Sequence, residues 1–172
     1  GLNYLDDRLA PLLIPLQVAE GQTELPPSQR DAVETIVRSL KHAATTHHLP
    51  VIQLLGADAA SKQVVACHAA AALGLHVYRL PAGVLPAQAA ELETLARLWQ
   101  RESMLLPVAL YLDAYEVERT TPTEGQGSPL HRFLARSSSI VFLDTRYVWP
   151  YVGRASLPLD IAKPSPAEQQ VS

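Results

Sequence analysis

Short apolar runs alternate along this chain with segments in which apolar residues recur every three or four positions. The strongest runs are nearly continuous, which is the pattern of strands buried on both faces of a parallel sheet. Strands are predicted at 51–55, 76–80, 107–112, 139–143 and 156–161. The pattern therefore favours a sheet that is covered on both sides.

The segments between these runs have the periodicity of amphipathic helices. Helices are predicted over 28–45, 62–73, 87–101 and 129–136. Ser28 stands at the start of the first as a capping residue, and Gly74 stands where a glycine ends the second. Residues 1–27 are rich in Leu and Pro and keep no lasting period. They are predicted to be an N-terminal extension to an α/β domain that spans residues 28–162.

Strands that alternate with helices in this way form an α/β, doubly wound sheet with right-handed crossovers. In such sheets ligands bind beyond the carboxyl ends of the strands. Three polar features fall at those ends, namely the segment 56–63, Asp113 and Asp144. Their convergence on one edge of the sheet predicts a functional site there.

Composition and charge exclude several classes of function. The 172 residues are 48% hydrophobic and 18% charged, as in a globular domain with a real core. The net charge is -3 without a cluster of Lys and Arg, which argues against nucleic acid as a partner. No apolar run approaches the roughly 20 residues of a membrane span. The single cysteine, Cys67, fits a reducing compartment. We therefore expect a cytoplasmic protein with neither nucleic-acid nor membrane partners.

The segment after the first predicted strand has the spacing of a phosphate-binding loop. Gly56 and Lys62 stand at the first glycine and at the lysine of the pattern G-x-x-x-x-G-K-[ST]. In that loop the backbone N–H groups and a helix N-terminus hold the phosphates, and the lysine reaches the β- and γ-phosphates. Ser61 replaces the second glycine, and Gln63 replaces the hydroxyl that holds magnesium. A strand–helix turn with a solvated lysine is the alternative interpretation.

Side chains also replace the conformational freedom that glycine gives to such a loop. Asp58 brings a carboxylate close to the expected phosphates. Two like charges ~5 Å apart repel by roughly 3 kcal/mol at an effective dielectric near 20, which weakens binding about a hundredfold unless Asp58 points outward. The predicted nucleotide-binding residues are Gly56, Ala60, Ser61, Lys62 and Gln63.

An acidic residue ends the third predicted strand. Asp113 matches the acid that serves magnesium in P-loop enzymes. Hydrolytic members carry a glutamate directly after it, whereas here Ala114 follows and Glu116 is the next acid. Such a shift moves the carboxylate far enough to remove most of its catalytic value. Asp113 and Glu116 are the catalytic candidates, with Asp113 as the magnesium ligand if nucleotide binds. The alternatives are a loop-capping carboxylate at Asp113 and a solvated charge at Glu116.

The order of these elements resembles the large subdomain of an AAA-type ATPase. That family has a phosphate loop after the first strand, an acid pair after the third, a polar sensor after the fourth and arginines before the fifth. Asp144-Thr145-Arg146 resembles the family's strand-end Thr-Asn-Arg, which implies a sensor-like role for Thr145 and Asp144. Gly153-Arg154 resembles the family's Gly-Arg, which implies that Arg154 is an arginine finger for a neighbour's nucleotide. Residues 163–172 resemble a linker toward a helical lid.

The departures from the family's motifs define the predicted function. The altered phosphate loop, the separation of Asp113 from Glu116 and the absence of the sensor Asn imply that the module is degenerate. The resemblance implies a P-loop NTPase-like three-layer sandwich with a five-stranded parallel sheet. The chain is similar in particular to the first modules of two-module AAA ATPases associated with contractile injection systems. This resemblance implies a ring with other AAA modules or subunits, a regulatory or assembly role, and weak or no ATP hydrolysis. ATP with magnesium is the candidate cofactor. A working ATPase and a purely structural interaction module are the two alternatives.

Overall fold

The computed structural model describes residues 8–17, 25–46, 48–116, 129–149 and 154–162. The strands are β1 (Ile14–Leu16), β2 (Val51–Leu55), β3 (His76–Pro81), β4 (Val108–Asp113), β5 (Val141–Thr145) and β6 (Ser156–Asp160). The helices are α1 (Pro27–Thr46), α2 (Ala59–Ala72), α3 (Ala89–Leu105) and α4 (Pro129–Arg136), with a short 3-10 helix at Ala82–Val84. Each predicted strand and helix has a counterpart here, so the predicted α/β class is confirmed.

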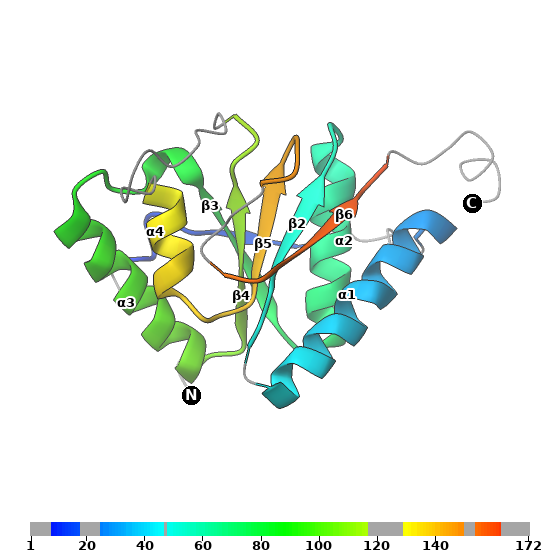
Figure 1. Cartoon of the computed structure of the whole chain (residues 1–172), viewed down its shortest axis with the longest axis horizontal. Coiled ribbons are helices and arrows are strands. Elements are labelled where there is room, and N and C mark those ends of the chain that lie inside the picture. The colour runs from blue at the N-terminus through cyan, green and yellow to red at the C-terminus, as the bar shows by residue number, and fades with distance from the viewer. Residues whose placement is uncertain (1–7, 18–24, 47, 117–128, 150–153, 163–172) are drawn as a thin grey trace.

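The strands form one six-stranded sheet in the order β1-β3-β4-β5-β2-β6. β1 pairs antiparallel with β3, and the remaining neighbours pair in parallel. Figure 1 shows α3 and α4 on one side of the sheet and α1 and α2 on the other. The sheet is therefore mixed and mostly parallel, and the fold has three layers.

Two hydrophobic cores lie on the two faces of the sheet. The core beneath α3 and α4 includes Trp99 and Phe133, both about 1% exposed. The core beneath α1 and α2 includes Ile36 and Val65, both fully buried. All residues of β2 and β5 are buried, because each strand contributes side chains to both cores. This double coverage explains why these strands are nearly continuous apolar runs in the sequence.

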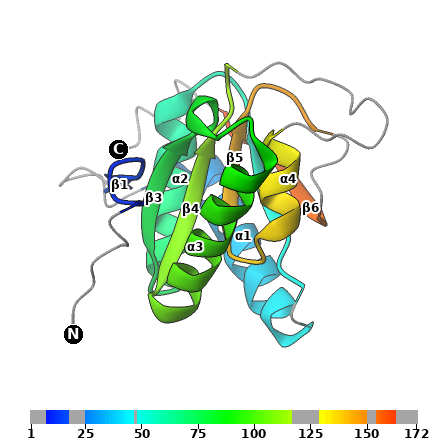
Figure 2. The ribbon, with the colours of Figure 1, turned by 90° about the vertical axis from the view of Figure 1, so that its left-hand side faces the viewer.

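The edge strand β1 belongs to the segment that was predicted to lie outside the domain. Ile14 pairs with Arg79 and Leu16 pairs with Val77, and Figure 2 shows β1 beside β3 at the edge of the sheet. Leu13, directly before the strand, is buried in the core beneath α3. Three residues around a proline are too short to show a periodic pattern, and an edge position tolerates that proline. The expectation of five strands was therefore one strand short.

Helix α2 begins at Ala59 rather than at Lys62, so the loop after β2 is shorter than expected. Alanine has the highest helix propensity, which favours helix at positions 59 and 60. The Ser61 hydroxyl donates a 2.5 Å hydrogen bond to the Asp58 carboxylate, which closes the first turn. Only positions 56–58 remain between strand and helix, so four of the five predicted nucleotide-binding residues lie inside α2.

Strand β5 also differs from its prediction, because it starts at Val141 rather than at 139. Ser139 is held in other contacts, since its hydroxyl accepts a 2.7 Å bond from the Trp99 indole and its carbonyl accepts a 2.9 Å bond from Arg154. The strand also ends later than the predicted residue 143, because Asp144 and Thr145 are its last two residues.

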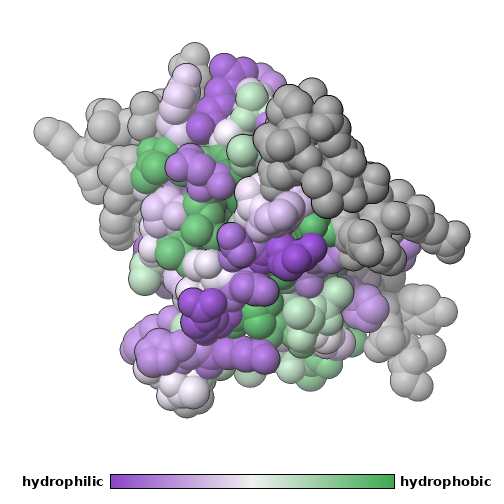
Figure 3. Space-filling model, turned by 90° about the vertical axis from the view of Figure 1, so that its right-hand side faces the viewer, coloured by the Kyte–Doolittle hydropathy of each residue, from purple (hydrophilic) through white to green (hydrophobic). Residues whose placement is uncertain are grey.

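The described surface on the side of α1 mixes hydrophilic and hydrophobic groups (Figure 3). The exposed charged positions of α1 carry both signs, at Arg30, Asp31, Glu34, Arg38 and Lys41. Within the described part of the chain, no helix combines the length and apolar content that crossing a membrane requires. The predicted linker at 163–172 lies outside the described residues.

Candidate functional site

The carboxyl ends of β2, β5 and β4 lie side by side at one edge of the sheet. β5 is the middle strand, so that Thr145 pairs with Leu55 of β2 and Asp144 pairs with Asp113 of β4. The Ala114 N–H donates a 2.9 Å hydrogen bond to the Asp144 carbonyl and continues this pairing past the end of β4. The strand-end polar residues that the sequence singled out therefore meet at a common edge.

Lys62 lies inside the molecule beneath this edge. Its side chain is fully buried, and its Nζ donates a 2.6 Å hydrogen bond to the Gly56 carbonyl. The same ammonium forms an ion pair with the Asp144 carboxylate. The Tyr115 ring lies against it, with Nζ 4.6 Å from the ring centroid. The lysine of the predicted phosphate loop thus has its charge matched by groups of its own chain.

Asp144 is as deeply buried as the lysine that it pairs with. Its side chain is 2% exposed, and its second oxygen accepts a 2.6 Å hydrogen bond from the Tyr111 hydroxyl. Burial, followed by the nearby Asp144 carboxylate, raises the pKa of Tyr111 well above its usual range. The phenol therefore stays protonated and serves as a fixed donor. One cation and one anion lie together here away from the protein surface, an arrangement that is strongly destabilised when either partner is removed.

Gly56 makes the turn that leads from β2 to the lysine. Its φ is +119°, a region that side chains rarely adopt. A Cβ at this position would lie 2.7 Å from the Ile161 carbonyl oxygen, just past the end of β6. The predicted glycine requirement therefore has a structural cause, which is close approach of the backbone of this chain.

The other predicted loop residues occupy different environments along α2. Ala60 is exposed, and Gln63 is half-buried. Ser61 is buried, where it accepts a 2.9 Å hydrogen bond from the Gln29 side chain while it donates to Asp58. The Asp58 carboxylate is therefore directed at the first turn of its own helix.

The predicted magnesium ligand is engaged by a cation. Arg79 on β3 donates hydrogen bonds of 2.5 and 3.2 Å to one oxygen of Asp113. The other oxygen accepts a 3.3 Å bond from the Tyr115 N–H. Glu116 is exposed. Among the described residues, no group of three or more His, Cys, Asp or Glu side chains is arranged to hold a metal ion.

The remaining two predicted residues are also bound within the chain. The Thr145 hydroxyl donates a 2.8 Å hydrogen bond to the Tyr147 carbonyl. Arg154 lies at the opposite end of the strands, where β2 and β5 begin. Its guanidinium donates to the carbonyls of Leu49, Ser137 and Ser139 at 2.5, 2.7 and 2.9 Å. Burial lowers the pKa of Arg154 to about 10, so it remains charged at neutral pH. In this structure Arg154 joins the segments that precede β2 and β5.

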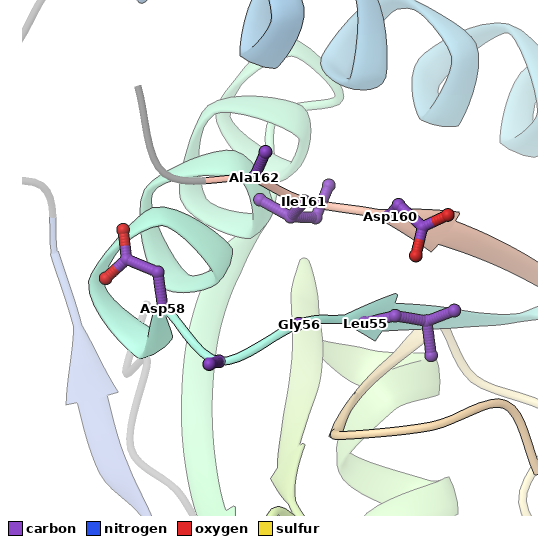
Figure 4. A pocket seen from close by; sticks show the side chains of 7 residues that line it. Leu55, Gly56, Asp58, Asp160, Ile161 and Ala162 are labelled. Carbon is purple, nitrogen blue, oxygen red and sulfur yellow. The ribbon is translucent and has the colours of Figure 1, made fainter. Parts of the chain in front are cut away.

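An open hollow of about 520 Å³ lies next to the Gly56 turn (Figure 4). It is lined by Leu55, Gly56, Ala57, Asp58, Asp160, Ile161 and Ala162. Its charged lining residues are two aspartates, and Figure 4 shows the Asp58 carboxylate pointing away from Asp160. Lys62 does not line this hollow. The space beside the turn is therefore acidic, which is unfavourable for a polyphosphate.

Sequence reasoning missed the residues that complete this site. Tyr111, Tyr115, Arg79 and Gln29 all contact predicted site residues. Tyr111 gave a weak indication of a buried polar contact. Its side chain carries a hydroxyl in an otherwise aliphatic run, and a buried hydroxyl needs a hydrogen-bond partner. Arg79 carried a similar signal in the middle of β3. Nothing in the local sequence marked Tyr115 or Gln29.

Comparison with known proteins adds no assignment: no protein-family model matches the chain, and no curated protein matches it. The class that the fold itself defines is an α/β domain with a mixed, mostly parallel six-stranded sheet. As arranged, its residues do not fit magnesium-bound ATP, because Lys62 and Asp113 are both neutralised internally.

Proposed function

We propose that this chain is a degenerate, AAA-like module of P-loop type that neither holds nor hydrolyses ATP. The observation that carries the proposal is the burial of Lys62 in an ion pair with Asp144. A phosphate-binding lysine must have its charge available to the ligand. The charge of Lys62 is instead paired with Asp144 on β5, the strand beside β2 in the sheet. A ligand would have to displace that aspartate and enter a region without solvent access.

Three further features support the absence of catalysis. Asp113 accepts hydrogen bonds from Arg79, which competes with any metal ion for the same oxygen. Glu116 is exposed, and no described contact orients it toward Asp113. The hollow at the Gly56 turn is lined by two carboxylates, which repel phosphate oxygens.

The positive role in this proposal is assembly or regulation within a larger ATPase. The AAA-like order of the motifs supports a module that packs beside other AAA modules or subunits in a ring. The likeness to the first modules of ATPases associated with contractile injection systems makes those machines the proposed setting. In this arrangement the chemical energy comes from another module.

Titration of the chain with a fluorescent ATP analogue, with and without magnesium, tests the proposal. We expect no saturable binding up to about 1 mM, the upper end of ordinary enzyme–substrate affinities, and no release of phosphate from ATP. A matched variant is Lys62→Met with Asp144→Asn, which removes both charges of the ion pair and keeps the interior neutral. It should give the same titration as the unaltered chain.

Micromolar binding that the paired variant abolishes would contradict the proposal and would favour a nucleotide site. Phosphate release that disappears in Glu116→Gln would favour a working ATPase. Circular dichroism of each variant shows whether the α/β fold is retained.

A further inference from the structure

We propose that the hollow between α3 and α4 is a binding site for a small organic monocarboxylate, a ligand that joins one carboxylate to an apolar body. The hollow lies on the face of the sheet that α3 and α4 cover, and it shares no residue with the candidate site at the strand ends. The site is therefore independent of the proposed function.

Space for such a ligand exists where the two helices meet. Figures 1 and 2 show α3 and α4 side by side, and a hollow of about 300 Å³ lies between them. Small-molecule sites begin at about this volume, so a ligand of modest size fits best. The lining residues are spaced three and four positions apart on each helix, which places them on one helical face. They are Ala89, Leu92 and Glu93 of α3 and Arg132, Ala135 and Arg136 of α4.

The apolar part of the lining suits the body of an organic ligand. Leu92 is 2% exposed and belongs to the core beneath α3 and α4. Ala89 and Ala135 contribute one methyl group each, so they leave open the volume that larger side chains would fill. An apolar group that enters the hollow leaves water and contacts these side chains, which is favourable.

Arg132 is the group that would bind the carboxylate. Its side chain is half-buried and lines the hollow, and its guanidinium forms no ion pair or hydrogen bond with the described part of the chain. A guanidinium has five N–H donors and binds a carboxylate through two parallel hydrogen bonds. Arg97 on α3 is exposed, so water has full access to its donors. An anionic ligand in the hollow would complete the hydrogen bonding of Arg132.

The charges around the hollow favour a single negative charge on the ligand. Arg136 forms an ion pair with Glu93 at 2.9 Å, and the two side chains are 67% and 46% exposed. This pair therefore connects the two helices at the rim of the hollow. Glu93 balances one of the two arginines, which leaves Arg132 as the unbalanced cation. A monocarboxylate matches that one charge, whereas a phosphate dianion brings a second charge close to Glu93 and is repelled by it.

Titration of the ¹⁵N-labelled chain with phenylacetate, followed by the NMR shifts of backbone amides, tests the proposal. We expect saturable shifts at the lining residues of α3 and α4, with a dissociation constant of about 1 mM. Phenylacetamide has the same ring without the charge. It should bind at least about tenfold more weakly, because it cannot form the charged hydrogen bonds to Arg132. Acetate keeps the charge without the apolar body and should also bind at least about tenfold more weakly.

Two pairs of variants locate the site. Arg132→Gln should weaken the binding of phenylacetate at least about tenfold. Arg97→Gln is its control, because it removes an exposed charge outside the hollow, and it should change binding by less than about twofold. Ala135→Leu fills the hollow from an exposed position and should abolish binding. Ala90→Leu places the same side chain at an exposed position of α3 that does not line the hollow, and it should leave binding unchanged.

The amide spectrum of each variant shows whether the fold is retained. The proposal is overturned if phenylacetate gives no saturable shifts up to about 20 mM, roughly twentyfold above the expected dissociation constant. It is also overturned if the shifts lie away from α3 and α4, or if phenylacetamide binds as tightly as phenylacetate. Equal weakening by Arg132→Gln and Arg97→Gln would likewise exclude Arg132 as the group that binds the carboxylate and would overturn it.

Discussion

Gly56 is the residue on which the geometry of the candidate site depends most directly. It combines a φ of +119° with close approach of the Ile161 carbonyl, just past the end of β6. Two effects therefore oppose any side chain here, namely backbone strain and a steric clash with backbone atoms. The turn that directs Lys62 into the interior requires this glycine for both reasons.

We predict that Gly56→Ala lowers the free energy of unfolding by about 2–4 kcal/mol. Two other glycines provide graded controls. Gly74 has a φ of +74° with open space around it, so Gly74→Ala should cost about 1 kcal/mol. Gly83 has open space and no positive φ, so Gly83→Ala should change stability by less than about 0.5 kcal/mol. Urea unfolding of the three variants measures the series, and equal effects at the three positions would contradict this explanation.

At the scale of elements, one polar side chain ties β2 to the connection between β5 and β6. Gln53 is fully buried in the middle of β2. Its amide accepts a 2.8 Å hydrogen bond from the Trp149 N–H and donates a 3.0 Å bond to the Trp149 carbonyl. It also donates to the Ser156 hydroxyl at 3.2 Å, at the start of β6. The side chain therefore satisfies buried backbone groups that belong to no ladder of the sheet.

The variant Gln53→Leu should lower the free energy of unfolding by about 2–4 kcal/mol, because it leaves the buried N–H and C=O of Trp149 without partners. Hydrogen exchange at the Trp149 amide should become faster in the same variant. Gln100→Leu is the matched control, since Gln100 makes two similar hydrogen bonds to Ser138 at an exposed position. Water can replace those bonds, so the control should cost less than about 1 kcal/mol. Equal losses for the two variants would show that burial of the network does not matter.

The elements also show where prediction from sequence succeeds. The helices and the strong strands were found because their periodic patterns are local properties of the chain. The start of α2 and the existence of β1 were missed, since alanines adopt helix wherever the fold permits and three residues show no period. The strand-end acids at 113 and 144 were found as site candidates, but their partners Arg79 and Lys62 were not assigned to them.

On the scale of the whole molecule, the buried ionisable groups couple folding to pH. The raised pKa of Tyr111 means that the folded protein keeps this proton at pH values where an unfolded tyrosine, with a pKa of about 10, loses it. Below about pH 10 both states are protonated, and the contribution of Tyr111 to stability is fully present. Above that pH the unfolded state binds fewer protons, so the free energy of unfolding falls as pH rises.

We therefore predict that the free energy of unfolding falls by up to about 1.4 kcal/mol per pH unit above pH 10. The variant Tyr111→Phe should not show this fall. Denaturant unfolding at about pH 9 and about pH 11 measures the slope in each protein. Tyr78→Phe serves as the control and should keep the slope of the unaltered chain. If Tyr111→Phe and Tyr78→Phe show the same slope, the buried tyrosine is not the source of the pH dependence.

The sequence by itself determined the alternation of strands and helices, the double burial of the central strands and the edge at which polar residues gather. These properties follow from local hydrophobic patterns, which each segment carries independently of the others. Only the tertiary structure decided that Lys62 faces Asp144 rather than solvent, because that pairing depends on β5 lying beside β2. The order of strands in a sheet is a long-range outcome of packing, and no local pattern records which strand end will neutralise a given charge.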